Sequence, residues 1–343
     1  MTHPKRKPTE FAINMCCSGF MLVQQEHILH PSVSEFFGDD IPHIYFVIKR
    51  PRVSFIPDTF TLTEQFLEID YQIKDKGNIK KYHLKTRNGL ETTNATLICE
   101  YPYTDYEIVD NPSKEVIAHG LVAALLNKAY YHLEDPSFLD CEILYIGQAF
   151  GKDGNRNAID RLRSHSTLQL IYSEAIRKNP DDEIWLCLLS FEQSSFTIMD
   201  GHTKFTKEEL EEDEKTFKDT FWKINYEGLN EAQKITFTEA ALIRYFQPEY
   251  NKEYKDSFPN KDHTSYSECY DLDINSVGFE METSDSIFCK FYSSAVDRNS
   301  LHMATFLCIR PKNEKHSLIF LHPLTCNSRI DISESTRVRR KKS

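Results

Sequence analysis

Two stretches of the chain carry most of the information about its fold: residues 141–147 read CEILYIG, and residues 235–251 read ITFTEAALIRYFQPEYN. The first is a short apolar run that predicts a buried strand, and a polar, glycine-containing loop follows it. The second has apolar residues at helical spacing and a proline near its end, which predicts a helix over 230–246. Between them the sequence predicts a helix over 158–178 and an apolar strand, EIWLCLLSF, at 183–191. Strand, helix, strand and helix in succession indicate an α/β core.

The regions on either side of this core are richer in strand signals than in helix signals. Apolar or alternating runs such as HIYFVIK and FLEIDYQI precede it, and runs such as VGFEME and MATFLCIR follow it. One further helix is predicted to begin at Asn111-Pro112-Ser113. We therefore expect a mixed α/β (α+β) protein with a β-rich region at 1–110, a connecting helix at 111–135, the core at 136–256, a second β-rich region at 257–330 and a basic tail at 331–343.

The composition is that of a folded protein. Of its 343 residues 40% are hydrophobic and 27% are charged, and no apolar run is long enough to cross a bilayer. Nine scattered cysteines without a CxxC pair favour reduced thiols, so we expect a cytoplasmic protein without membrane contact. The formal net charge of −11 argues against nonspecific coating of nucleic acid, but a local basic groove is compatible with it.

Glu239 is the first candidate for chemistry. Its neighbours on the predicted helix surface are Ile235, Leu242 and Ile243, so the carboxylate lies on an apolar stripe. A buried carboxylate is costly unless it is paired or binds a metal. The pattern is compatible both with a metal ligand and with a structural salt bridge, for example to Arg244.

Arg161 and His165 are four residues apart and therefore share a face near the start of their predicted helix. Helix starts favour anions, arginine binds phosphate bidentately, and histidine transfers protons near neutral pH. A solvated helix face is the simpler interpretation of either residue alone. The preceding loop contains neither GxxxxGK[ST] nor GxGxxG, which argues against a nucleotide triphosphate site.

Taken in order, these features resemble the GIY-YIG nuclease family. A strand ends in Tyr145-Ile146-Gly147, and Arg161 and His165 follow on a helix. Glu239 lies on a later helix, twelve residues before Asn251 of QPEYN. The resemblance covers about a third of the chain and implies a small GIY-YIG-like sheet flanked by helices.

The resemblance implies a role for each matched residue. Glu239 would bind one divalent metal, Mg²⁺ or Mn²⁺, and Arg161 would contact the scissile phosphate. Tyr145 would help to order the attacking water, and His165 would transfer protons or contact the phosphate. Two residues would support the site: Gly147, where the backbone passes close to the substrate, and Asn251, through hydrogen bonds. The expected nucleic-acid contacts are the basic residues Lys152, Arg156, Arg163, Arg177 and Lys178.

In the family, a first motif lies on a strand shortly before YIG, and its tyrosine is the favoured general base. Here the residues directly before CEILYIG read as a helix and a turn. Two groups of tyrosines are candidates for this role: Tyr130 and Tyr131 on the predicted helix, and Tyr101, Tyr103 and Tyr106 near a predicted strand.

The resemblance predicts a metal-dependent endonuclease that hydrolyses DNA, with defence against foreign DNA as one setting for such enzymes. One alternative is a module that has the nuclease fold without cleavage and binds DNA or a protein partner through the β-rich regions. Another is an enzyme that cleaves RNA. A tyrosine hydroxyl from any strand near Glu239, Arg161 and Tyr145 would favour the enzyme.

Overall fold

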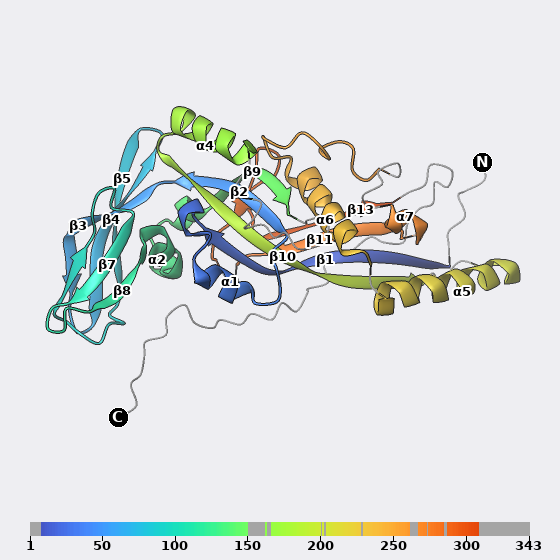
Figure 1. The fold of residues 1–343 in the computed structure, drawn as a ribbon, viewed down its shortest axis with the longest axis horizontal. Coiled ribbons are helices and arrows are strands. Elements are labelled where there is room, and N and C mark those ends of the chain that lie inside the picture. Colours follow the sequence, from blue (N-terminus) through green and yellow to red (C-terminus); the bar gives the residue numbers. More distant parts are fainter. Residues whose placement is uncertain are drawn as a thin grey trace, which may run out of the picture.

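The computed structural model describes residues 8–149, 162, 166–199, 201, 204–227, 229–260, 267–272, 274–284 and 287–308. A seven-stranded sheet runs through the centre of the protein, and two three-stranded sheets lie together at one end (Figure 1). Helix α5 lies at the opposite end (Figure 1). The protein is therefore mixed α/β, as the sequence predicts. Within the described part of the chain, no helix is both long and apolar enough to span a membrane.

The central sheet has the strand order β12-β9-β2-β10-β1-β11-β13. Its neighbours are antiparallel except for two parallel pairs, β1 with β11 and β9 with β12. The strands are β1 (Thr9–Val23), β2 (Ile44–Pro51), β9 (Cys141–Gln148), β10 (Asp182–Met199), β11 (Ser276–Glu282), β12 (Phe291–Tyr292) and β13 (Leu301–Leu307).

This sheet combines regions that the sequence pattern separates. Strands β1 and β2 come from the first 110 residues and β11 to β13 come from the C-terminal region, yet all of them pair in one sheet with β9 and β10. The expected core at 136–256 therefore has no sheet of its own. The physical reason is that β9 and β10 are buried, so their backbone groups need partners on both sides, and distant strands supply them.

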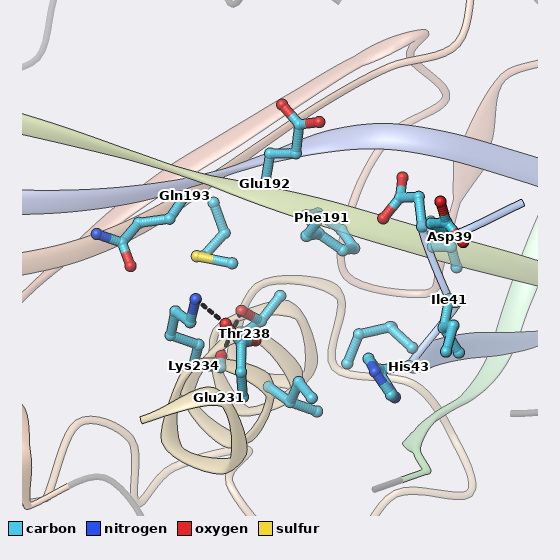
Figure 2. Close-up of a pocket in the computed structure, with 14 residues that line it drawn as sticks. Asp39, Ile41, His43, Phe191, Glu192, Gln193, Glu231, Lys234 and Thr238 are labelled. Carbon is cyan, nitrogen blue, oxygen red and sulfur yellow. Dashed lines mark hydrogen bonds and ion pairs between the residues drawn. The ribbon is translucent and has the colours of Figure 1, made fainter. Parts of the chain in front are cut away.

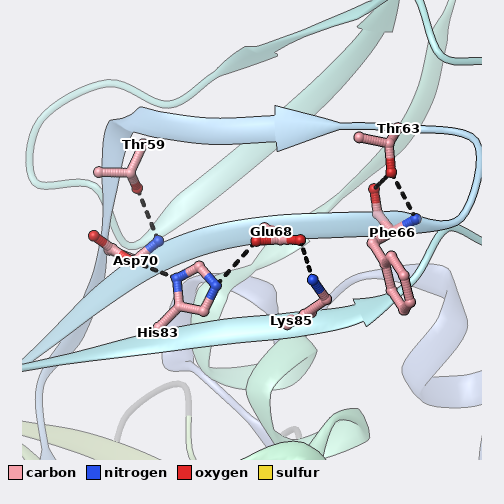
Figure 3. Close-up of polar contacts among 7 residues, drawn as sticks. All are labelled: Thr59, Thr63, Phe66, Glu68, Asp70, His83 and Lys85. Atoms are coloured by element: carbon pink, nitrogen blue, oxygen red, sulfur yellow. Dashed lines mark hydrogen bonds and ion pairs between the residues drawn. The ribbon is translucent and has the colours of Figure 1, made fainter.

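The two small sheets lie between β2 and β9 in the sequence. They consist of β3 (Val53–Leu62), β4 (Phe66–Asp75) and β5 (Asn78–Arg87), and of β6 (Ala95–Ile98), β7 (Asp105–Asp110) and β8 (Val116–Leu121). On the outer face of β4 and β5, the ring of His83 lies 2.7 Å from a carboxylate oxygen of Asp70 and 3.3 Å from one of Glu68 (Figure 3). Lys85 also pairs with Glu68, at 2.6 Å (Figure 3).

The prediction of a connecting helix at 111–135 is wrong over its first half. Residues Val116–Leu121 form β8, which pairs with β7, and the helix α2 is confined to Val122–Lys128. Two short 3-10 helices follow, at Tyr130–His132 and Pro136–Leu139. Apolar residues four apart fitted a helix, but strand pairing with β7 outweighs that local preference.

The remaining helices cover the central sheet and its ends. They are a 3-10 helix (Gln25–His27), α1 (Pro31–Phe37), α4 (Ser166–Lys178), α5 (Lys207–Trp222), the π-helical turn η4 (Lys223–Glu227), α6 (Glu231–Phe246) and α7 (Glu268–Asp271). Helix α5 carries a strongly acidic stretch, KEELEEDEK at 207–215, and a capping box between Thr206 and Glu209 begins it. The side chain of Asn230 caps the start of α6, and Gln247 ends it in a left-handed conformation at φ 50°.

Residue alternation along β2 distinguishes the two faces of the sheet. Tyr45 and Val47 pack in an apolar cluster with residues of α1 and α4, whereas Ile44 and Phe46 pack in the cluster that contains the apolar residues of α6. Helices α4 and α6 therefore cover opposite faces of the β2–β9 pair.

Candidate active site at strand β9

Strand β9 carries the YIG residues and pairs with β2 so that Gly147 lies opposite Tyr45. A Cβ at position 147 would lie 2.5 Å from both Cζ and Oη of Tyr45, and 2.8 Å from Cε1 of Tyr145. These distances are far below carbon–carbon contact distance, so only glycine fits here without movement of the rings. The centroids of the Tyr45 and Tyr145 rings are 6.2 Å apart. Tyr45 is fully buried, whereas Tyr145 is half-buried.

Tyr45 is not among the tyrosines that the sequence pattern singles out. It lies in HIYFVIK, a run that the sequence does predict to be a strand, but 100 positions before Tyr145. The signal that could have found it is the dipeptide Ile44-Tyr45 inside this strand, with His43 before it. The tyrosines proposed from sequence pack elsewhere: the ring of Tyr106 lies 5.7 Å from that of Phe55, for example, and the ring of Tyr130 lies 5.8 Å from that of Phe288.

Asn251 is hydrogen-bonded to the backbone of the middle YIG residue. Its Oδ1 accepts from the N–H of Ile146 at 2.9 Å, and its Nδ2 donates to the carbonyl of Ile146 at 2.8 Å. The N–H of Tyr250 donates to the carbonyl of Leu144 at 3.0 Å. Strand β12 pairs only with the first two residues of β9. Further along the same edge of β9, the segment around Asn251 forms the hydrogen bonds to its backbone. Asn251 is 7% exposed, and both bonds are buried.

Glu239 lies on α6 and is 8% exposed. One turn earlier on the same side of the helix, Thr236 accepts a hydrogen bond from Nε2 of Gln148, at the end of β9, at 3.4 Å. Glu239 therefore lies on the side of α6 that faces β9, whereas the rings of Tyr45 and Tyr145 lie on the other face of the sheet. Arg244, the partner considered in the structural alternative, forms an ion pair with Asp256 at 2.9 Å.

Most of the expected phosphate and nucleic-acid contacts fall outside the described residues. These are Lys152, Arg156, Arg161, Arg163 and His165, together with the tail at 331–343. Leu162 is described, and it is buried in the same apolar cluster as Tyr45.

Of the expected nucleic-acid contacts, the structure describes Arg177 and Lys178, both exposed at the end of α4. The ammonium of Lys178 lies 2.6 Å from a carboxylate oxygen of Glu174, which also accepts a hydrogen bond from the hydroxyl of Tyr250 at 2.6 Å. These hydrogen bonds, the one from Lys178 first, lower the pKa of the Glu174 carboxyl, while that of the Tyr250 hydroxyl is raised by burial and by the carboxylate. The Glu174–Tyr250 contact ties α4 to the segment that carries Asn251.

The donor set available to a metal is small. Among the described residues, no three or more His, Cys, Asp or Glu side chains are grouped so as to hold a metal ion. Mg²⁺ does not need such a group, because it commonly binds through one or two carboxylates and completes its octahedron with water and substrate phosphate. Glu239, on the side of α6 that faces β9, supplies one such carboxylate, and it lies across the sheet from the Tyr45 and Tyr145 rings. No family model, curated protein or solved structure matches the chain.

Proposed function

We propose that this protein is a metal-dependent endonuclease that hydrolyses DNA phosphodiester bonds at the edge of strand β9. The observation that carries the proposal is the pairing of Tyr45 with Gly147, beside Tyr145. A strand tyrosine beside the YIG residues is what the resemblance to the GIY-YIG family leads us to expect, so this pairing supports the proposal. The buried bonds from Asn251 to Ile146 support the same assignment, because they hold the YIG backbone in place.

The described residues divide into those that position the site and those that touch substrate. Tyr45 is fully buried, so its contribution is to hold the neighbouring ring and to require glycine at position 147. Tyr145 is half-buried, and its hydroxyl would orient the attacking water. Asn251 keeps the backbone at Ile146 rigid. Such preorganisation counts because small displacements of catalytic groups are costly in rate.

Glu239 would hold the metal. When bound, Mg²⁺ or Mn²⁺ supplies positive charge that stabilises the developing charge on the phosphate. Arg161 would add a second positive charge at the scissile phosphate, and His165 would exchange a proton with it. Because the net charge of the chain is −11, binding to DNA rests on local basic residues, among which Arg177 and Lys178 lie at the exposed end of α4.

The test is cleavage of supercoiled plasmid, single-stranded DNA and RNA by the purified chain with Mg²⁺, Mn²⁺ or a chelator. We expect metal-dependent nicking of DNA, and Tyr145→Phe should slow it at least about tenfold without weakening DNA binding. The matched control is Tyr226→Phe, since Tyr226 is 66% exposed and lies in η4, which is not an element of the proposed site. No cleavage of any substrate would overturn the enzyme and favour a binding module, and cleavage of RNA alone would favour the RNA-cleaving alternative.

A further inference from the structure

A cavity of ≈ 520 Å³ opens between the first half of α6 and strands β1 and β10 (Figure 2). Its floor is apolar and comes from three separate elements, with Met15 on β1, Leu189 on β10 and Ile235 on α6, each at most 6% exposed. Cavities of several hundred Å³ with apolar walls and a few polar groups are the usual binding sites for small molecules. This cavity is large enough for a ligand of about six to ten non-hydrogen atoms with room for water.

The charged groups around the cavity are distributed unevenly. On α6, the ammonium of Lys234 forms an ion pair with Glu231, so these two charges cancel (Figure 2). Lys234 is the one lysine or arginine among the described residues that line the cavity. Asp39 and Asp40 line it from the segment after α1, and both are exposed. Glu192 on β10 also lines the cavity and is exposed. The lining therefore carries three carboxylates whose negative charge Lys234, already paired with Glu231, does not offset.

We propose that this cavity binds a small primary amine carried on an apolar stem. The stem would lie against Met15, Leu189 and Ile235, where burial removes apolar surface from water. The ammonium would lie at Asp39 and Asp40, where a charge-assisted hydrogen bond forms with carboxylate. An anionic ligand would be repelled by these carboxylates, and a neutral ligand would form no ion pair with them.

The cavity is separate from the residues proposed for cleavage but continuous with their elements. His43 and Ile44, which line it, immediately precede Tyr45, and Thr238 immediately precedes Glu239. The inference does not depend on the proposed nuclease function, since it rests on the shape and charge of the cavity alone. A ligand bound here would contact the same segments of β2 and α6 that carry the site.

The experiment compares n-hexylamine with n-hexanol, which share the same stem, by titration into the full chain labelled with ¹³C at the methionine methyl groups. The chain has six methionines, and Met15→Leu assigns the resonance of Met15. We expect saturable shifts of the Met15 methyl, with hexylamine binding at least about tenfold tighter than hexanol at low salt. Asp39→Asn/Asp40→Asn should weaken hexylamine about tenfold and leave hexanol unchanged.

The control is Glu211→Gln/Glu212→Gln on α5, which removes the same number of negative charges at exposed positions away from the cavity. It should leave both affinities unchanged. All four substituted side chains are exposed, so the variants should fold like the wild type. Equal affinity for amine and alcohol, absence of saturable binding at Met15, or equal weakening by the two double variants would each overturn the proposal. Cleavage of DNA is not measured, so failure here leaves the proposed nuclease function to its own test.

Discussion

Replacing Gly147 by alanine tests whether the Tyr45 ring lies against the YIG backbone. The added Cβ would be 2.5 Å from Cζ and Oη of Tyr45, so the ring must move by about 1 Å to restore a contact of about 3.5 Å. Tyr45 is fully buried and packs in one apolar cluster with residues of α4, so its ring cannot move without displacing its neighbours. Overpacking of this kind costs about 1–3 kcal/mol of unfolding free energy.

The assay is chemical denaturation at equilibrium, with Gly89→Ala as the matched control. A Cβ at Gly89 would have no atom within 4 Å, and its φ is compatible with alanine, so its cost should stay within about 0.5 kcal/mol. In a Tyr45→Leu background the cost of Gly147→Ala should fall, because the two contacts at 2.5 Å are gone and only the contact with Cε1 of the half-buried Tyr145, at 2.8 Å, remains. A cost below about 0.5 kcal/mol in the wild-type background, or an equal cost in both backgrounds, would refute the placement of Tyr45.

Three further predictions concern hydrogen bonds and protonation. Asn251→Ala removes the side-chain partners of the buried N–H and carbonyl of Ile146 and should lower the free energy of unfolding by about 2–4 kcal/mol in the same assay. A loss under about 1 kcal/mol would show that these two hydrogen bonds do not hold the YIG backbone in place. The hydrogen bond with Asp70 raises the pKa of His83, so its stabilising effect should be complete below about pH 6.5 and disappear as pH rises through the raised value; the wild type and His83→Gln should diverge at low pH and converge at high pH (Figure 3). Burial lowers the pKa of His302, so its stabilising effect should be complete above about pH 6.5 and be lost as pH falls toward the lowered value; a pH profile for His302→Gln identical to that of the wild type would rule this out.

Local signals were sufficient for most of the elements around the site. The helix expected over 230–246 is α6, at Glu231–Phe246, because an asparagine cap and a following proline mark its two ends. The runs HIYFVIK and CEILYIG are strands β2 and β9, because their apolar composition suits a buried sheet. The mixed α/β class follows from these elements and is confirmed.

The pairing that completes the candidate site could not be predicted in the same way. Between β2 and β9 the chain forms two small sheets and α2, and apart from the dipeptide Ile44-Tyr45 neither strand's sequence indicates a partner so far away. The resemblance predicts a general-base tyrosine shortly before YIG, whereas Tyr45 lies 100 residues before Tyr145. The sequence pattern does not predict strand β1, although β1 pairs with β10 over almost its whole length. In each case a long-range backbone pairing decides the structure, and residue spacing within one segment does not report it.

The proposed nuclease function is tested most directly by comparing the wild type with Glu239→Gln in cleavage of supercoiled plasmid. Both proteins are purified identically and assayed side by side with Mg²⁺. Glu239 is 8% exposed, and glutamine has nearly the same size and shape as glutamate, so Glu239→Gln should remain folded. We predict that the wild type nicks the plasmid only when metal is present, and that Glu239→Gln, although folded, does not nick it. Equal nicking by the two proteins, or a clear loss of stability with cleavage retained, would contradict a metal-binding Glu239 and the endonuclease built on it.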